Sequence, residues 1–160
     1  MSARIVEPYA ELAPLLEAER RRGARIGLTN GCFDVLHVGH VRLMREGAAL
    51  VDAFVVALNS DASARGNKGP DRPFVPLAER MEVVAALEGV DYVTSFDAAT
   101  AHALLETLRP DVYVKGRDRT PETVPEADLV QGYGGRLAFA GDPKDHSSTE
   151  LIERIRGGRS

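Results

Sequence analysis

The chain has 160 residues, which suits one α/β domain, and a chain of this length buries roughly 70% of its unfolded surface on folding. Its formal net charge of -4 and isoelectric point near 5.6 argue against a sequence-independent nucleic-acid binder with a basic face, and leave open a local basic pocket for phosphates. Cys32 is the single cysteine, so an intramolecular disulfide and a Cys-x-x-Cys site are both excluded.

The same features give expectations about location. A lone cysteine fits a reducing compartment. Residues 1–25 mix charged side chains with leucines, so they lack the continuous apolar stretch of a signal peptide. Nowhere do 18 consecutive apolar residues occur, which excludes a membrane-spanning helix. We therefore expect a cytoplasmic protein that binds neither membranes nor nucleic acids.

Apolar periodicity predicts alternating helices and strands. Residues 8–22 carry leucines at helical spacing and end before Gly23, which predicts a first amphipathic helix. Short apolar runs predict five strands, at residues 26–29, 54–58, 92–94, 112–114 and 137–140. Segments of helical length follow these runs, at residues 38–50, 77–87, 101–108, 122–133 and 149–156. This alternation predicts an α/β fold with a five-stranded parallel sheet covered by helices.

Residues 60–76 fit neither pattern. Glycines and prolines interrupt the charged residues of this segment at Gly66, Gly69, Pro70, Pro73 and Pro76. We therefore expect a long mobile loop. Loops of this length inside a compact domain are often functional, so Lys68 and Arg72 are candidate ligand contacts. A solvated surface loop is the alternative interpretation.

The strongest chemical signal follows the first predicted strand. Parallel α/β sheets bind ligands at the carboxyl ends of their strands, and residues 29–40, Thr-Asn-Gly-Cys-Phe-Asp-Val-Leu-His-Val-Gly-His, lead from that end into a helix. The sequence contains neither the GxGxxG dinucleotide fingerprint nor the GxxxxGK phosphate loop. NAD binding and P-loop phosphoryl transfer both lose support.

His37 and His40 stand three residues apart at the predicted helix start. At that spacing both imidazoles can face the first turn, where backbone N–H groups and the helix dipole favour phosphate, and Gly39 would let a phosphate approach the backbone. A zinc pair would want a third ligand and usually i,i+4 spacing. Spacing alone therefore leaves three interpretations open: a phosphate clamp, a metal pair and two ordinary polar residues.

Several motifs in the expected order point to a family. They are residues 29–40, Asn59-Ser60-Asp61, Lys68-Gly69-Pro70, Arg72-Pro73, Arg80, Arg109-Pro110-Asp111, Lys115-Gly116, Thr120-Pro121-Glu122-Thr123 and Ser147-Ser148-Thr149. Together they resemble the HxGH nucleotidyltransferase superfamily. Residues 25–156 look most like its adenylyltransferase domain acting on D-glycero-β-D-manno-heptose 1-phosphate. The resemblance implies a three-layer Rossmann-like fold in one domain over residues 1–160, with an N-terminal helix over 1–24 and a catalytic core over 25–156.

The resemblance also implies a reaction. AMP would pass from ATP to the sugar 1-phosphate, giving ADP-heptose and pyrophosphate, with Mg²⁺ bridging the phosphates and the enzyme forming a homodimer or higher homo-oligomer. Two other functions stay open. One is a CTP-dependent glycerol 3-phosphate cytidylyltransferase, and the other is a non-catalytic nucleotide-binding regulatory module, against which the intact His37 and His40 speak.

Roles for individual residues follow from the resemblance. Catalytic contacts with the triphosphate are implied for His37, His40, Lys68 and Arg80. Acceptor binding is implied for Asp34, Lys68 and Arg72. Nucleotide binding is implied for Thr29, Asn30, Gly31, Phe33, Gly39, Asn59, Lys115, Gly116, Asp118, Ser147, Ser148 and Thr149. No residue is assigned as a metal ligand.

Some of these residues have structural alternatives. Arg80 could pair with a neighbouring glutamate on a solvated face, and Ser147 to Thr149 could cap the last helix. Asp34 could be a turn residue, and Asn59 could bond to backbone at a strand end. The chain also departs from the family pattern at Arg117 and Glu150, and Arg117 is expected to add a charge near the base or sugar site.

Overall fold

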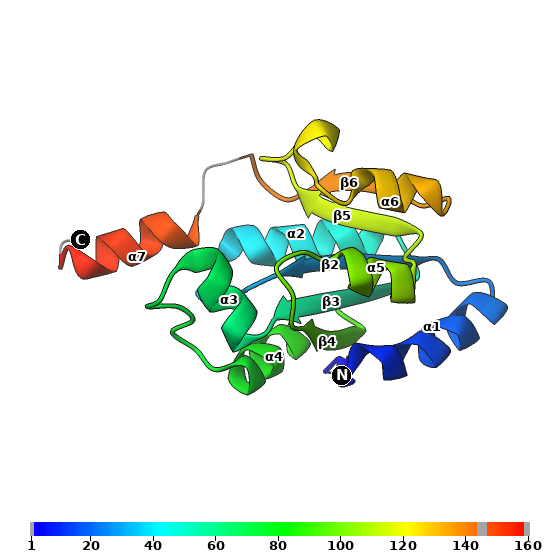
Figure 1. The fold of residues 1–160 in the computed structure, drawn as a ribbon, viewed down its shortest axis with the longest axis horizontal. Helices are drawn as coiled ribbons and strands as arrows, with labels where there is room; N and C mark the ends of the chain where they lie inside the picture. Colours follow the sequence, from blue (N-terminus) through cyan, green and yellow to red (C-terminus); the bar gives the residue numbers. More distant parts are fainter. Residues whose placement is uncertain (1, 144–146, 159–160) are drawn as a thin grey trace.

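A sheet of parallel strands forms the centre of the computed structural model, which describes residues 2–143 and 147–158 (Figure 1). The strands in this part of the chain are β1 (Arg4–Ile5), β2 (Ile26–Gly31), β3 (Ala53–Asn59), β4 (Tyr92–Phe96), β5 (Val112–Gly116) and β6 (Arg136–Ala140). They are arranged in the order β1-β4-β3-β2-β5-β6, and every neighbouring pair is parallel.

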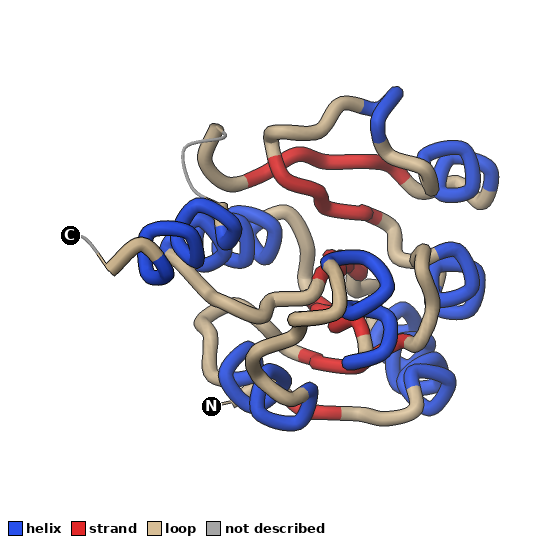
Figure 2. The backbone as a smooth tube through the Cα atoms, turned by 60° about the vertical axis from the view of Figure 1, so that its left-hand side comes forward, coloured by secondary structure: helices blue, strands red, loops and turns tan. Residues whose placement is uncertain are grey.

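Helices cover both faces of this sheet, as Figure 2 shows. The α-helices described are α1 (Leu12–Arg21), α2 (Val38–Ala49), α3 (Asp61–Lys68), α4 (Leu77–Ala85), α5 (His102–Leu108), α6 (Ala127–Gly132) and α7 (Ser148–Arg156). Short 3-10 turns occur at Tyr9–Glu11 and Pro121–Thr123. Helix α7 projects from one end of the molecule (Figure 1).

Two buried apolar clusters define three layers. On one face of the sheet, Leu16 of α1 and Leu105 of α5 belong to a cluster that also contains residues of α6. On the other face, Met44 of α2 and Met81 of α4 pack with β3. The predicted three-layer parallel α/β class is thereby confirmed. Strands buried on both faces read as continuous apolar runs, as β3 does from Ala53 to Leu58.

The sheet has six strands in the described part of the chain, so the prediction of five was wrong. The additional strand, β1, has only two residues, which is too short to produce a periodic pattern. It is held by tertiary pairing with β4, since Arg4 pairs with Tyr92 and the Val6 N–H donates to the Val93 carbonyl at 2.9 Å.

The expected loop over residues 60–76 is also corrected, because its first half is helix α3. Ser60 caps this helix by accepting a hydrogen bond from the Ser63 N–H, and Asp61 adds a favourable negative charge to the first turn. Gly66 concealed the helix from the sequence pattern, since glycine is a poor helix former. The expected helix over residues 122–133 is likewise shorter, and α6 begins at Ala127.

Strand order fixes where a ligand can bind. From β2 the chain builds β3 and β4 on one side, then crosses back to add β5 and β6 on the other side. The order therefore reverses at β2, and the loops that leave β2 and β5 diverge. Such a switch point forms a crevice at the carboxyl ends of the strands.

Two glycines in helices give a matched test of the packing. A Cβ at Gly47 of α2 would lie 2.8 Å from the buried Phe54 ring, whereas a Cβ at Gly66 of α3 would meet nothing within 4 Å. We predict that Gly47→Ala lowers the free energy of unfolding by about 1–3 kcal/mol through overpacking. Gly66→Ala should raise it by about 0.5–1 kcal/mol, because alanine is the better helix former. Urea unfolding measures both, and equal effects at the two positions would contradict the close contact between α2 and β3.

Candidate active site

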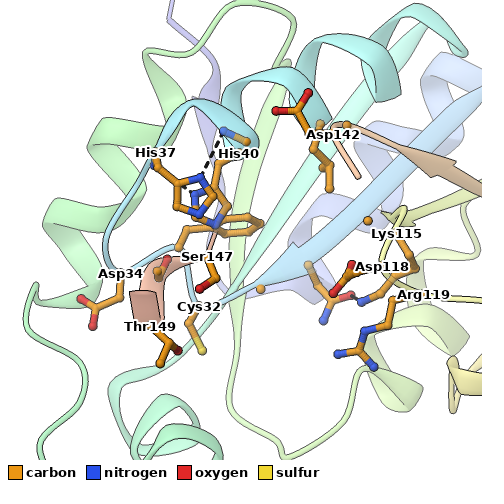
Figure 3. Close-up of a pocket in the computed structure, with 18 of the residues that line it drawn as sticks. Cys32, Asp34, His37, His40, Lys115, Asp118, Arg119, Asp142, Ser147 and Thr149 are labelled. Atoms are coloured by element: carbon orange, nitrogen blue, oxygen red, sulfur yellow. Dashed lines mark hydrogen bonds between the residues drawn. The ribbon is translucent and has the colours of Figure 1, made fainter. Parts of the chain in front are cut away.

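A cavity of about 340 Å³ opens at the carboxyl ends of β2, β5 and β6, between the start of α2, the end of α3 and the start of α7 (Figure 3). Most of the predicted site residues line it: Asn30, Gly31, Phe33, Asp34, His37, Gly39, His40, Lys68, Arg72, Lys115, Gly116, Asp118, Ser147, Ser148 and Thr149. Its volume lies in the usual range for small-ligand sites. The segments that sequence reasoning singled out therefore meet in one place.

His37 and His40 cap the first turn of α2 reciprocally. His37 Nδ1 accepts a hydrogen bond from the Gly39 N–H at 3.1 Å, and His40 Nδ1 accepts one from the His37 N–H at 3.2 Å. The two rings lie side by side, with their centroids 3.9 Å apart (Figure 3). A neutral imidazole that accepts through Nδ1 carries its proton on Nε2. The caps therefore select the tautomer that donates through Nε2.

His40 is held neutral by its surroundings. Burial, with smaller contributions from the neighbouring His37 and the positive charge of Lys68, lowers the pKa of His40 to about 4. In addition, a proton on Nδ1 would displace the capping hydrogen bond from the His37 N–H. In the protein without a bound ligand, His40 is thus a neutral hydrogen-bond donor at physiological pH.

Phe33 closes the cavity behind His40. Its ring meets the His40 ring edge to face, with the centroids 5.5 Å apart, and its backbone adopts a positive φ of 49°. A Cβ at Gly31 would lie 3.0 Å from the Phe33 ring, so glycine at this strand end makes room for it. The sequence Gly31-Cys32-Phe33 therefore orients the imidazole of His40.

Asp34 binds protein groups. Its carboxylate accepts hydrogen bonds from Arg72 Nε at 2.7 Å and from the backbone N–H groups of Phe74 and Val75 at 2.9 Å. Burial alone would raise the pKa of the Asp34 carboxyl, but the bonds from Phe74, Arg72 and Val75 outweigh it and hold the pKa below its usual value. Asp34 thus fastens residues 72–76, which we call the strap, to the loop after β2.

The opposite wall of the cavity is built by β5 and the residues that follow it. Lys115 Nζ lies 3.4 Å from Asn30 Oδ1, which also accepts a hydrogen bond from Tyr113. Burial lowers the pKa of the Lys115 ammonium, and Glu126 partly offsets this. A Cβ at Gly116 would lie 2.7 Å from Asp118 Oδ1, so glycine allows this carboxylate to fold over the strand end.

Helix α7 contributes a third wall. Ser147 caps the helix by accepting a hydrogen bond from the Glu150 N–H at 3.0 Å. Ser148 Oγ donates to the Val35 carbonyl at 2.8 Å, which joins the helix start to the loop after β2. Ser147 and Thr149 both line the cavity, and Figure 3 shows Thr149 on the side of Cys32 and Asp34. Capping and cavity lining therefore coexist at this helix start.

Three predicted site residues do not reach the cavity. Thr29 and Asn59 are buried, 2% and 4% exposed, and Asn59 Nδ2 donates to Ser63 Oγ at 2.8 Å. The Arg80 side chain is fully buried, and its carboxylate partner is Asp61 rather than a neighbouring glutamate on a solvated face. The structure thus separates these residues from the site that the other predicted residues form.

Sequence reasoning missed several residues that line the cavity. They are Cys32, Leu43, Arg119, Ala140, Gly141, Asp142 and Pro143. Most of them follow β2, β5 or β6, so the carboxyl-end rule could have found them. Arg117 does not add a charge to the cavity, because its guanidinium donates to the Gly141 carbonyl at 2.7 Å and to Glu46 at 3.1 Å.

Neither a metal cage nor a membrane span is found within residues 2–143 and 147–158. No three His, Cys, Asp or Glu side chains of these residues are grouped so that they could hold a metal ion. In the same residues, no helix is both long enough and apolar enough to cross a membrane. Mg²⁺ can also be bound mainly through substrate phosphates and water, with one or two carboxylates at most. The carboxylates that line the cavity, Asp34, Asp118 and Asp142, are oxygen ligands of the kind that this mode uses.

The fold and the site define a class of protein. A parallel α/β sheet with paired histidines at the helix that follows a central strand, beside a cavity at the carboxyl ends of the strands, is the arrangement of a nucleotidyltransferase. The chain belongs to the cytidylyltransferase-like family, whose model matches residues 28–154.

Several proteins named HldE are similar to this chain in sequence. The bifunctional protein HldE of Syntrophotalea carbinolica is 51% identical over 144 residues, which are 90% of this chain and 29% of the relative. HldE of Geotalea uraniireducens is 48% identical over 147 residues, 92% of this chain and 30% of the relative. The chain therefore spans about three tenths of the length of these relatives.

One solved structure shows the same fold. It is described as the lipopolysaccharide core biosynthesis protein from Thermoplasma volcanium GSS1, with a TM-score of 0.64 and 24% sequence identity. The match covers 76% of this chain and 100% of that chain. At this identity the likeness concerns the fold alone.

The low pKa of His40 predicts how stability depends on pH. The unfolded chain takes up a proton at His40 near pH 6.5, but the folded chain does so only near pH 4. Lowering the pH through this window therefore favours the unfolded state, by about 2 kcal/mol between pH 7 and pH 5. Urea unfolding at both pH values should show this loss in the wild type and a smaller loss in His40→Asn. An NMR titration that places the His40 pKa near 6.5 would contradict the buried, capping geometry.

Proposed function

We propose that the chain transfers AMP from ATP to a sugar 1-phosphate, D-glycero-β-D-manno-heptose 1-phosphate, and releases pyrophosphate. The observation that carries this proposal is the start of α2, where His37 and His40 offer Nε2 donors beside a helix N-terminus at the cavity wall. Support for the acceptor comes from the family motifs and from the HldE relatives, which are named bifunctional and match this chain over a limited part of their length.

The proposed reaction needs no strong base. The phosphate oxygen of the acceptor is already a nucleophile at neutral pH, and it forms a bond to the α-phosphorus of ATP. The bond from that phosphorus to the oxygen of the β-phosphate breaks, and pyrophosphate leaves with the electron pair. Positioning and stabilisation of the developing negative charge therefore supply the rate acceleration.

His37, His40 and Lys68 are the groups proposed to act on the phosphates. Neutral imidazoles donating through Nε2 can bind the equatorial oxygens of the α-phosphate, and the positive end of α2 favours the same charge. Lys68, at the end of α3, lies close enough to His40 to lower its pKa, so it lies near the same phosphates. A bound phosphate would in turn raise the pKa of His40.

Mg²⁺ is proposed to enter with the nucleotide. When bound, this ion would supply positive charge that offsets part of the negative charge on the departing pyrophosphate. Of the carboxylates at the cavity, Asp34 binds the strap, Asp142 pairs with Arg42 and Asp118 is proposed to bind the nucleoside, so Mg²⁺ would be held mainly by the phosphates and water. Resemblance alone supports the remaining parts of the proposal, a cytoplasmic location and a homodimer or higher homo-oligomer.

The base and ribose are proposed to lie against the β5 wall, at Lys115, Gly116 and Asp118, where the cavity extends away from the histidines (Figure 3). Arg72 would then face the phosphate of the acceptor from the strap. A second candidate function keeps this geometry with CTP and glycerol 3-phosphate. The cytidylyltransferase-like family match is the observation that favours it.

The test is magnesium-dependent pyrophosphate release from ATP or CTP, each paired with the heptose 1-phosphate or glycerol 3-phosphate. We expect turnover with ATP and the heptose phosphate. His40→Ala should lower kcat by about 10² to 10³, the usual cost of removing one donor that stabilises a transition state. His102→Ala, which changes an exposed histidine outside the cavity, is the matched control and should leave the rate unchanged.

Other outcomes overturn parts of the proposal. Turnover only with CTP and glycerol 3-phosphate would retain the chemistry and replace both substrates. Nucleotide binding without pyrophosphate release from any pair would favour the regulatory module. Equal losses in His40→Ala and His102→Ala would remove the proposed role of the α2 start.

A further inference from the structure

Arg80 is the largest fully buried side chain among the described residues, and it is charged. From α4 its guanidinium donates to three backbone carbonyls: Nε to Val75 at 2.8 Å, and Nη1 to Cys32 at 2.7 Å and Asn59 at 2.8 Å. Nη2 donates to Asp61 Oδ1 at 2.7 Å. One side chain thus bonds the loop after β2, the end of β3, the start of α3 and the strap.

Asp34 binds the strap from the other side. Its carboxylate accepts from the Val75 N–H at 2.9 Å, while the Val75 carbonyl accepts from Arg80. Val75 is therefore fixed through both of its backbone polar groups by two buried charges of opposite sign. Asp61 extends the network, because its Oδ1 also accepts from the Leu77 N–H at 3.1 Å and so links the start of α3 to the start of α4.

The two cations that face the cavity from this side depend on these bonds. Lys68 is the last residue of α3, whose first residue, Asp61, is bonded to Arg80. Arg72 begins the strap and is bonded to Asp34. We propose that Arg80 is a positioning residue, which sets Lys68 and Arg72 against the histidines of α2 by fastening α3 and the strap to the carboxyl ends of β2 and β3.

The bonds of Arg80 favour this role over direct phosphate binding. To reach a phosphate in the cavity, the guanidinium would have to leave its four partners and a fully buried position. The Asn59 carbonyl, whose bond to Arg80 is buried, and the part-buried Val75 and Cys32 carbonyls would then lose this donor. A buried group left unsatisfied costs about 1–3 kcal/mol. Lysine cannot reproduce the bonds of the planar guanidinium, because its ammonium has a single donor nitrogen.

The inference rests on the proposed function for its kinetic readout, and a double-mutant cycle tests it. Arg80→Lys, Lys68→Ala and the double variant are compared by kcat and KM in pyrophosphate release. Arg80→Lys should lower kcat by about 10², the cost of misplaced catalytic groups, while its KM for ATP changes little. Because both changes act through Lys68, the loss in the double variant should fall short of the product of the single losses by about 10-fold or more.

A second readout is independent of any substrate. Hydrogen exchange at the Phe74 and Val75 amides should accelerate in Arg80→Lys, while the amides of β3 keep their wild-type protection. Asp61→Asn weakens one partner of Arg80 and leaves Arg80 itself in place, so it should show the same change in exchange. This variant replaces Arg80→Lys in the test if Arg80→Lys does not fold. A wild type without pyrophosphate release would refute the proposed function and leave this readout intact.

Two results would overturn the positioning role of Arg80. Multiplicative losses in the cycle would show that Arg80 acts separately from Lys68, as a direct phosphate ligand would. Unchanged exchange at Phe74 and Val75 in both variants would show that the strap does not depend on Arg80. Either result overturns the inference.

Discussion

The reciprocal capping of α2 by His37 and His40 is the constraint on which the site depends. A helix start must satisfy its exposed backbone N–H groups, and here imidazole Nδ1 atoms do so in place of the usual hydroxyl or carboxylate. Because Nδ1 accepts, the donor proton stays on Nε2, and because burial disfavours the cation, the donor is neutral. The same bonds that stabilise the helix therefore prepare its side chains to donate to a phosphate.

Around this helix start, the chain uses charged side chains as structural ties. Asp34 and Arg80 hold the strap from its two sides, and Glu46 binds Arg117 and the Gly141 N–H just after the carboxyl end of β6. These ties lie at the carboxyl edge of the sheet, where loops would otherwise lack the apolar packing that fixes the helices. Several charges expected to meet a ligand instead fix the backbone that carries the ligand contacts.

Sequence periodicity predicted the layers because the apolar residues that β3 and the amphipathic helices bury leave a regular pattern in the sequence. It missed β1, whose two residues are placed by pairing alone, and α3, where Gly66 weakens the pattern. Among site residues, a motif with fixed spacing located His37 and His40. The motifs could not show that Arg80, unlike these histidines, lies in the interior. Whether a guanidinium faces a cavity or the interior is decided by contacts between residues far apart in the chain.

The most direct measurement is a crystal structure of the protein with Mg²⁺ and α,β-methylene ATP, an analogue whose bridge between the α- and β-phosphates cannot be cleaved by this transfer. We expect the α-phosphate within hydrogen-bond distance of Nε2 of His40 and beside the first turn of α2, with Lys68 near the same phosphate and Arg80 still bonded to Val75. Two results would contradict this: a triphosphate bound away from α2, or an Arg80 guanidinium that has left its buried bonds and contacts the triphosphate.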